Sequence, residues 1–385
     1  DNKRMGSGDD GVMRILHFAD LHLDASFAGS GMPPEAATRR REELRRALRR
    51  IMDLAVLHGV GAVTIAGDLY EQDRYTLDTG NFLREQFERI RPIQVFIAPG
   101  NHDPWVPHSL YRRVAWPDNV FIFRDQVLRP YPLEELTIWG AAHCSPACRE
   151  NLIAGIKVPP EGRHLLLLHA SDISSLPDAK LAFCPLTTGD IEQAGFDLAL
   201  LGHYHGARLS PAGRPVLCYP GSPESLGFDE LGKRHVLLLE MDGERKTIEL
   251  LEVEHRPYEV LSVDVSSATT RDSIRETVAG LSRDRGLAEA CVRLHLIGTL
   301  HPEVELNPEG LLADLGEHFA FLTLRDETHP GYDVEVLMQD LTVKGAFVRK
   351  MAGLMEKGSP SQRDLARDAL FLGLHALEGR ELRPG

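Results

Sequence analysis

The sequence predicts an α/β protein in which two sheets, packed as layers and flanked by helices, are followed by a smaller α+β domain and C-terminal helices. Short apolar strands alternate with amphipathic helices in the N-terminal part, which is typical of right-handed crossovers and mainly parallel pairing. A run of strands without helices follows, and the total number of strands indicates two sheets. Near residue 257 the sequence changes character and a new series of strands and helices begins.

The first elements are placed by their apolar patterns. Residues 14–19 and 62–66 are short apolar runs that read as buried strands. Residues 39–58 carry apolar side chains at helical spacing, which predicts an amphipathic helix. The opposite face of this helix is rich in arginine. It is either a solvated face balanced by nearby glutamates or a contact surface for a phosphate backbone or an acidic partner.

The rest of the N-terminal part continues the same pattern. A helix is expected at about 78–90. Residues 216–219, 235–240 and 246–253 are expected to form antiparallel strands. The other expected strands are apolar runs at residues 93–98, 120–124, 136–140, 164–168 and 197–201.

Four segments are predicted from these patterns. Residues 1–12 read as a tag or disordered tail without the apolar region of a signal peptide, and residues 13–257 form the main domain. Residues 258–340 form the α+β domain, for which a capping or recognition role and a purely structural role both stay open. Residues 341–385 form a helical segment. Apolar residues cover most of the helix circumference at 364–377, so this helix should be buried against its own protein or a partner.

Composition places the chain among folded cytoplasmic proteins. Apolar residues make up 43% and charged residues 26% of the chain, and no apolar run approaches the ~18 residues of a membrane span. The five cysteines are odd in number and contain no C-x-x-C pair, which indicates reduced thiols. The net charge of −14 argues against nucleic-acid binding through bulk charge. Local basic strips and metal-mediated phosphate binding remain compatible with it.

Polar motifs recur at one kind of place, the C-terminal end of a predicted strand. In open α/β sheets, binding sites form outside the carboxyl ends of the strands, so five separate loops are expected to converge. The motifs are D-L-H (Asp20, His22), G-D (Asp68), G-N-H-D (Asn101, His102), a single His169, and G-H-Y-H (His203, His205).

The residue types in these motifs indicate metal binding. A mixed set of nitrogen and oxygen donors suits Mn²⁺, Fe or Zn²⁺ better than Ca²⁺ or Mg²⁺. Seven donors are too many for one first-row ion, but they suit two ions ~3.5–4 Å apart that clamp the oxygens of a phosphoryl displacement. Each motif alone could have a purely structural role, since a D-x-H or a histidine at the end of a strand is common in proteins that bind no metal. His17, inside the first strand, is expected to be structural.

Through these five motifs, residues 13–257 resemble the calcineurin-like metallophosphoesterases. The resemblance implies a two-layered β-sandwich with flanking helices. It also implies two metal ions that share the carboxylate of Asp68. The implied ligands are Asp20, His22, Asp68 and His205 for one ion, and Asp68, Asn101, His169 and His203 for the other.

The resemblance further implies that His102 acts without binding metal, by protonating the leaving oxygen or stabilising the transition state. The family often has an aspartate where this chain has Glu71, and we expect Glu71 to orient His102. No residue is assigned to substrate binding.

Within the family, the sequence is most similar to the SbcD-type DNA-repair exonucleases. The similarity rests on M-R-I-L-H-F-A-D-L-H-L, I-A-G-D-L-Y, P-G-N-H-D and Y-P-G-S-P-E-S-L-G-F. It implies DNA cleavage with Mn²⁺, a DNA-capping role for the α+β domain, and an ABC-type ATPase partner that docks on residues 343–378. A homodimer through the helices near 35–58 or 78–90 is a further expectation.

Two other functions stay open from the sequence. One is a phosphodiesterase for small nucleotide-type diesters, since such enzymes use the same metal ligands. The other is a non-catalytic scaffold of the same fold. The scaffold is disfavoured because scaffolds of this fold tend to have lost ligands, whereas every expected ligand is present here.

Overall fold

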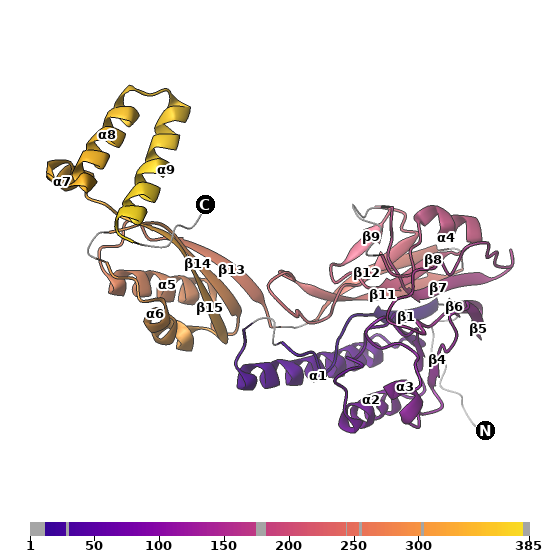
Figure 1. Cartoon of the computed structure of the whole chain (residues 1–385). Coiled ribbons are helices and arrows are strands. Elements are labelled where there is room, and N and C mark those ends of the chain that lie inside the picture. Colours follow the sequence, from indigo (N-terminus) through magenta and orange to yellow (C-terminus); the bar gives the residue numbers. More distant parts are fainter. Residues whose placement is uncertain are drawn as a thin grey trace, which may run out of the picture. The chain divides into compact units, whose positions relative to one another are not determined.

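The computed structural model describes residues 12–27, 31–174, 182–243, 245–253, 256–301 and 304–379. The chain divides into two compact units, Asp1–Tyr258 and Glu259–Gly385, which we call the N-terminal and C-terminal units (Figure 1). The tail predicted for residues 1–12 lies outside the described residues except at its last position, where the first strand begins.

The first sheet of the N-terminal unit has the strand order β12-β11-β1-β2-β3-β4. Strands β1 to β4 are parallel, as the alternation with helices predicts. Strand β11 pairs antiparallel with β1 and with β12, which confirms two of the three antiparallel strands expected after residue 215. The bounds are β1 Val12–Phe18, β2 Ala62–Ile65, β3 Gln94–Ile97, β4 Val120–Ile122, β11 Arg234–Asp242 and β12 Arg245–Val253.

The second sheet has the order β5-β6-β7-β8-β10-β9. The prediction for residues 216–219 was wrong in part, because β10 pairs parallel with β8 and antiparallel only with β9. Strand β9 is three residues long and lies at the edge, so it has no apolar pattern that the sequence could reveal. The bounds are β5 Arg129–Leu133, β6 Leu136–Gly140, β7 Arg163–His169, β8 Leu198–Gly202, β9 Arg208–Ser210 and β10 Leu217–Tyr219.

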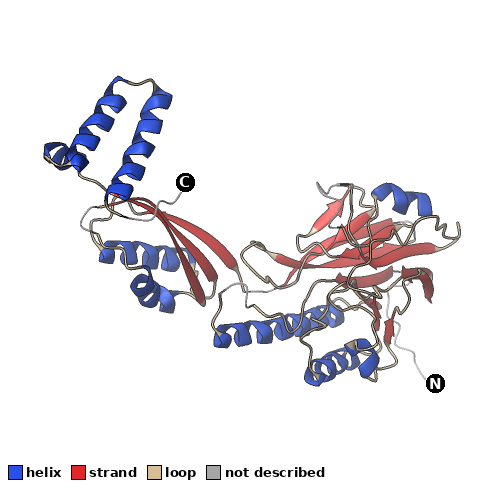
Figure 2. Cartoon of the chain, in the orientation of Figure 1, coloured by secondary structure: helices blue, strands red, loops and turns tan. Residues whose placement is uncertain are grey.

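The two sheets pack face to face around one apolar core. Ile15 and Phe96 of the first sheet share this core with Ile138, Leu165 and Leu198 of the second, and all five are fully buried. Helices cover the outer faces of the two layers (Figure 2). The predicted α/β sandwich flanked by helices is therefore confirmed. The helices are α1 Pro34–Leu57, α2 Leu77–Arg89, α3 Leu110–Arg113 and α4 Thr188–Ala194.

Helix α1 starts five residues earlier than the apolar pattern alone indicates. Pro34 stands at its first position, where a fixed φ and a missing N–H cost nothing. The arginine face is only partly solvated. Arg40 is buried and its Nη2 lies 2.8 Å from Glu224 Oε1, while Arg45 pairs with Asp78 on α2 at 2.7 Å. These ion pairs fix α1 against its surroundings.

The C-terminal unit contains a three-stranded sheet in the order β13-β14-β15. Two helices bury one apolar stripe each against it, and Val278, Leu294 and Leu311 are fully buried in the shared core. No described helix of the chain is both long and apolar enough to cross a membrane. The bounds are β13 Tyr258–Asp264, α5 Arg271–Arg285, β14 Cys291–Leu300, α6 Pro308–Leu315, a 3-10 turn Gly316–His318 and β15 Phe321–Pro330.

Three further helices follow, namely α7 Val334–Gln339, α8 Val343–Lys357 and α9 Pro360–Leu377. Leu370 and Leu374 of α9 are buried in the packing with α8. Leu365 on the same helix is 70% exposed, and Leu372 and Leu377 are also exposed. Packing against its own protein, one of the two alternatives predicted for this helix, therefore accounts for one face of α9, and burial of the other face against a partner stays a prediction.

His17 has the structural role that the sequence predicts. It is fully buried in β1, where Nδ1 lies 3.0 Å from Thr64 Oγ1 and Nε2 lies 3.3 Å from the carbonyl oxygen of Leu201. Because burial disfavours the imidazolium, the pKa of His17 falls from 6.5 to about 4 on folding.

Acidification should therefore destabilise the N-terminal unit through His17. Between pH 6.5 and 4 the unfolded chain binds a proton that the folded chain does not, so the free energy of unfolding falls as pH falls. From pH 7 to 5 we expect the native protein to lose about 2 kcal/mol more than a His17→Gln variant. Urea unfolding followed by tryptophan fluorescence measures this unit, because Trp105, Trp116 and Trp139 all lie in it. Equal losses in the two proteins would contradict the assignment.

Candidate metal centre

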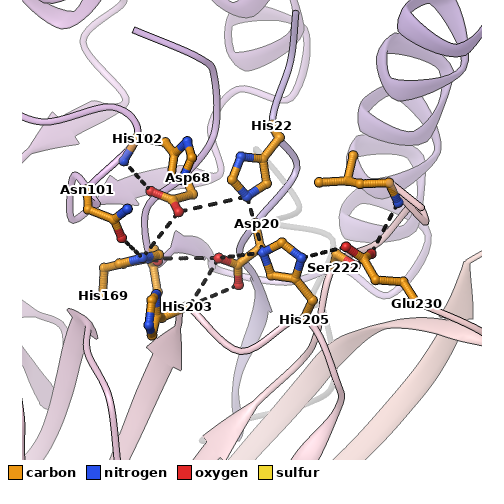
Figure 3. A network of polar contacts seen from close by, with 12 residues as sticks. Asp20, His22, Asp68, Asn101, His102, His169, His203, His205, Ser222 and Glu230 are labelled. Carbon is orange, nitrogen blue, oxygen red and sulfur yellow. Dashed lines mark hydrogen bonds and ion pairs between the residues drawn. The ribbon is translucent and has the colours of Figure 1, made fainter. Parts of the chain in front are cut away.

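The polar strand-end residues come together at one place in the N-terminal unit (Figure 3). They arrive from both sheets. Strands β1, β2 and β3 of the first sheet end just before the first group, and β7 and β8 of the second sheet carry the rest. The residues brought together are Asp20, His22, Asp68, Asn101, His102, His169, His203 and His205.

One cluster of ligand atoms is formed by Asp20, His22 and His205, whose candidate donor atoms lie within 4.8 Å of one another. The Nε2 atoms of His22 and His205 are 3.3 Å apart. Two imidazole nitrogens that face each other with their lone pairs repel at this distance, so a proton or a cation between them would stabilise the arrangement.

A second cluster is formed by Asp20, Asp68 and His169, again within 4.8 Å. Asn101 joins it, with Oδ1 2.9 Å from His169 Nε2. Asp68 Oδ2 lies between the clusters, 3.8 Å from Nε2 of His22 and 3.3 Å from Nε2 of His169. Asp20 belongs to both groups, so the two clusters share its carboxylate.

His203 differs from the other candidate ligands. Its backbone N–H donates to both carboxylate oxygens of Asp20 at 3.0 Å. Its ring lies against His169, with centroids 5.1 Å apart. Among the described residues, the two clusters do not include its ring nitrogens. His203 thus reaches the site and holds Asp20.

The turns that carry these residues are tight and partly strained. Asp20, His22, Asp68 and His203 all have positive φ values, between 49° and 105°. Left-handed backbone of this kind persists at non-glycine positions only when surrounding contacts impose it, and it is often associated with function. The motif glycine Gly67 has φ 78°, and a Cβ there would lie 2.8 Å from Nδ1 of His169. A side chain at Gly67 would therefore displace a ligand.

Glu71 links two histidines of the site. Its Oε1 lies 2.7 Å from His22 Nδ1, and its Oε2 lies 3.0 Å from His102 Nδ1, so it orients His102 as expected. The hydrogen bond that His102 donates to the Glu71 carboxylate raises the pKa of His102 to about 9. The His102 side chain is 45% exposed, more than the other residues around it. At neutral pH its ring therefore carries a positive charge at the open side of the site.

Two residues that the sequence reading missed support the ligands. Glu230 Oε1 lies 2.6 Å from Nδ1 of His205, which leaves Nε2 directed into the site. Asp103 does not enter the site, although it belongs to the G-N-H-D motif. It accepts hydrogen bonds from the backbone N–H groups of Asp68, Leu69 and Gly100 and so joins two of the turns. The position of Asp103 beside Asn101 and His102 in the sequence could have indicated its role. Glu230 lies 25 residues after His205, and no sequence motif connects the two.

The electrostatics of the site fit divalent cations. Asp20 and Asp68 are almost fully buried, and burial raises the pKa of Asp20. Burial acts on Asp68 in the same direction, but His169, His22 and His102 together outweigh it and hold the pKa of Asp68 well below its ordinary value. Buried carboxylates require compensating positive charge. Oxygen and imidazole donors together are the ligands that Mn²⁺, Fe and Zn²⁺ accept.

Comparison with known proteins agrees with this chemistry. The family profile described as Calcineurin-like phosphoesterase matches residues 13–207. An uncharacterized metallophosphoesterase, YhaO of Bacillus subtilis, is 29% identical over 322 residues, which cover 79% of this chain and 76% of the relative. The DNA double-strand break repair protein Mre11 of Sulfurisphaera tokodaii is 24% identical over 68% of each chain. The SbcD component of the nuclease SbcCD of Escherichia coli is 25% identical over 67% of this chain and 73% of its own.

The chain therefore belongs to the calcineurin-like phosphoesterase family, whose members are hydrolases that use divalent metals. The residues of the family motifs are those that gather in the site, and the donor set suits the metals that such enzymes use.

Removing the carboxylate behind His205 should weaken metal binding without unfolding the chain. We expect Glu230→Gln to lower the affinity for Mn²⁺ about 10- to 100-fold, because the ligand loses the partner that fixes its orientation. Isothermal titration of metal-free protein measures this. Glu240→Gln is the matched control, since Glu240 pairs with Arg14 on the surface. Unchanged affinity in Glu230→Gln would show that His205 does not depend on this bond.

Proposed function

We propose that this protein is a two-metal-dependent phosphodiesterase that hydrolyses DNA, as an exonuclease or endonuclease in DNA repair. The observation that carries the proposal is the pair of overlapping ligand clusters around Asp20 and Asp68, with His102 exposed beside them. Mn²⁺ is the proposed ion, and Fe or Zn²⁺ would fit the same donors.

Most of the proposed ligands belong to the two clusters. Asp20, His22, Asp68 and His205 would hold one ion, and Asp68, Asn101, His169 and His203 the other. For His203 to bind metal, a ring nitrogen must approach the second cluster more closely than it does in this structure. When bound, two such ions polarise the phosphoryl group and supply a hydroxide nucleophile at neutral pH.

His102 is the proposed acid. Because Nδ1 of His102 is hydrogen-bonded to Glu71, its Nε2 is the nitrogen that remains available to a substrate. The raised pKa keeps the ring protonated at neutral pH, so His102 can donate a proton to the leaving oxygen as the phosphodiester bond breaks. Glu71 holds the ring in place and stabilises the imidazolium before the transfer.

DNA as the substrate is supported by the relatives. Their names describe a nuclease and DNA double-strand break repair proteins, and they match about two thirds of this chain rather than the motifs alone. The exposed leucines of α9 are the proposed docking surface for an ABC-type ATPase partner. The proposal also includes a homodimer that forms through α1 and α2. The α+β domain would cap the DNA, and the protein would be cytoplasmic.

The experiment that tests the substrate uses defined DNA ends and a generic diester side by side. With Mn²⁺ we expect release of nucleotides from linear DNA together with hydrolysis of bis(p-nitrophenyl) phosphate. Chelation with EDTA should abolish both activities. Hydrolysis of the small diester without any cleavage of DNA would overturn the nuclease and favour a phosphodiesterase for small nucleotide-type diesters. Absence of both with two ions bound would instead indicate a scaffold.

Loss of His102 should separate metal binding from catalysis. We expect His102→Ala to lower kcat about 10²- to 10⁴-fold, because the leaving oxygen no longer receives a proton in the transition state. The metal content, measured by plasma mass spectrometry, should stay at the native value. His58→Ala, at the C-terminus of α1, is the control. Full activity in His102→Ala would refute the role assigned to His102.

A further inference from the structure

A second group of reactive side chains lies behind the metal centre in the same unit. Cys148, Cys184 and His143 are each only 1% exposed, and their donor atoms lie within 4.8 Å of one another. The Sγ atoms of the two cysteines are 2.7 Å apart. All five cysteines of the chain are described, and each is a thiol.

The backbone holds the two thiols against each other. The N–H of Cys184 donates to the carbonyl oxygen of Cys148 at 3.0 Å. Cys184 has φ 41°, a left-handed conformation that a cysteine rarely adopts without constraint. The two loops are therefore fixed in a geometry that opposes one sulfur to the other.

The contacts favour a bond between the sulfurs over a shared metal ion. Two thiolates on one zinc ion stand about 3.7 Å apart, from Zn–S bonds of about 2.3 Å in a tetrahedron. A disulfide needs about 2.05 Å, so the sulfurs have less far to move. In addition, His143 Nε2 lies 2.7 Å from the carbonyl oxygen of His169, so its proton is already donated there. The ring nitrogen beside Cys184 is thus not a ready ligand.

We propose that Cys148 and Cys184 are a redox modification site that forms a disulfide with an oxidant of the peroxide class. Cys148 gives up its thiol proton, and the resulting thiolate attacks one peroxide oxygen. The O–O bond breaks and the departing hydroxide takes up that proton, so that a sulfenic acid and one water are formed. The Cys184 sulfur then attacks the Cys148 sulfur. The S–S bond forms, the S–O bond breaks, and a second water leaves with the remaining thiol proton. Two thiols are oxidised and one peroxide is reduced to two waters.

The roles of the two sulfurs follow from their hydrogen bond. Cys184 donates its S–H to Cys148, which lowers the pKa of Cys148 to about 7. The same bond raises the pKa of Cys184. Cys148 is thus the nucleophile at neutral pH, and Cys184 resolves the sulfenic acid. Burial restricts the first step to a small oxidant.

The residues next to the thiols connect them to the metal centre. Phe183 precedes Cys184, and its ring lies edge-on to His203 with centroids 5.3 Å apart. Arg149 follows Cys148, lies 4.6 Å from the centroid of Phe183, and donates to the carbonyl oxygen of Ala182 at 2.7 Å. Joining the sulfurs moves both loops, so it should shift Phe183 against His203.

The test treats the folded full-length chain with hydrogen peroxide and then counts thiols after denaturation. We expect the count to fall from five to three, with a mass loss of two hydrogen atoms and a linked peptide pair that contains Cys148 and Cys184. Cys148→Ser should lose no thiol to a disulfide. Cys218→Ser should still form the bond, because Cys218 is equally buried but its sulfur donates to the carbonyl oxygen of Ala199.

Three results would overturn the proposal. One is a link between Cys144 and Cys148, and another is oxidation of single cysteines to sulfinic acid without any link. The third is one tightly held Zn²⁺ per chain that Cys148→Ser releases, which would replace the redox site by a metal site.

An activity measurement tests the coupling, and this part alone rests on the proposed function. After peroxide is removed and Mn²⁺ restored, we expect hydrolysis of bis(p-nitrophenyl) phosphate to be several-fold slower, with recovery in dithiothreitol. Cys148→Ser should show no such change. An unchanged rate in the linked protein would refute the coupling. If the reduced protein does not hydrolyse the diester, the proposed function is refuted, but the proposed disulfide is not.

Discussion

Two buried carboxylates, Asp20 and Asp68, are the constraint on which the rest of this structure depends. A carboxylate taken out of water is costly unless positive charge or several hydrogen bonds replace the water. Here, imidazoles and backbone N–H groups surround both side chains, with His203 donating through its N–H to Asp20 and His102 to Asp68 in the same way. The left-handed backbone at both aspartates is the conformation that brings these donors and acceptors together.

Hydrogen bonds to residues outside the proposed set of ligands keep the imidazoles in their orientation. Glu71 and Glu230 each bind the Nδ1 atom of a histidine, so the Nε2 atom of His22 and of His205 points inward. The carbonyl oxygen of Ala66 does the same for His169. A histidine with one nitrogen fixed in this way presents the other as a defined donor. The geometry of the centre is thus set in part by residues outside the proposed set of ligands.

Most of the site and the fold class could be predicted from the sequence because both follow simple local signals. Apolar runs that end in Asp20, Asp68 or His169 place polar groups at the same edge of a sheet. The supporting residues could not be found in this way. Glu230 lies in a loop without regular structure, and only the fold brings it to His205. Asp103 stands beside Asn101 and His102, yet it points back into the turns.

The misses in secondary structure have similar causes. Strand β9 and helix α7 are too short to show a period, and the parallel pairing of β10 depends on how the chain returns through β9. The solvent-facing leucines of α9 show the limit of another rule, since an apolar helix surface indicates burial but does not identify the surface that covers it.

The origin of the ligands from two different sheets has a consequence for stability. Asp20, Asp68 and Asn101 extend from the first sheet, and His169 and His203 from the second, so neither layer alone holds a complete set of donors. An ion bound between them acts as a cross-link across the sandwich. The free energy of metal binding would then add to the free energy that holds the two layers together, and loss of the ion would weaken their packing as well as the proposed chemistry.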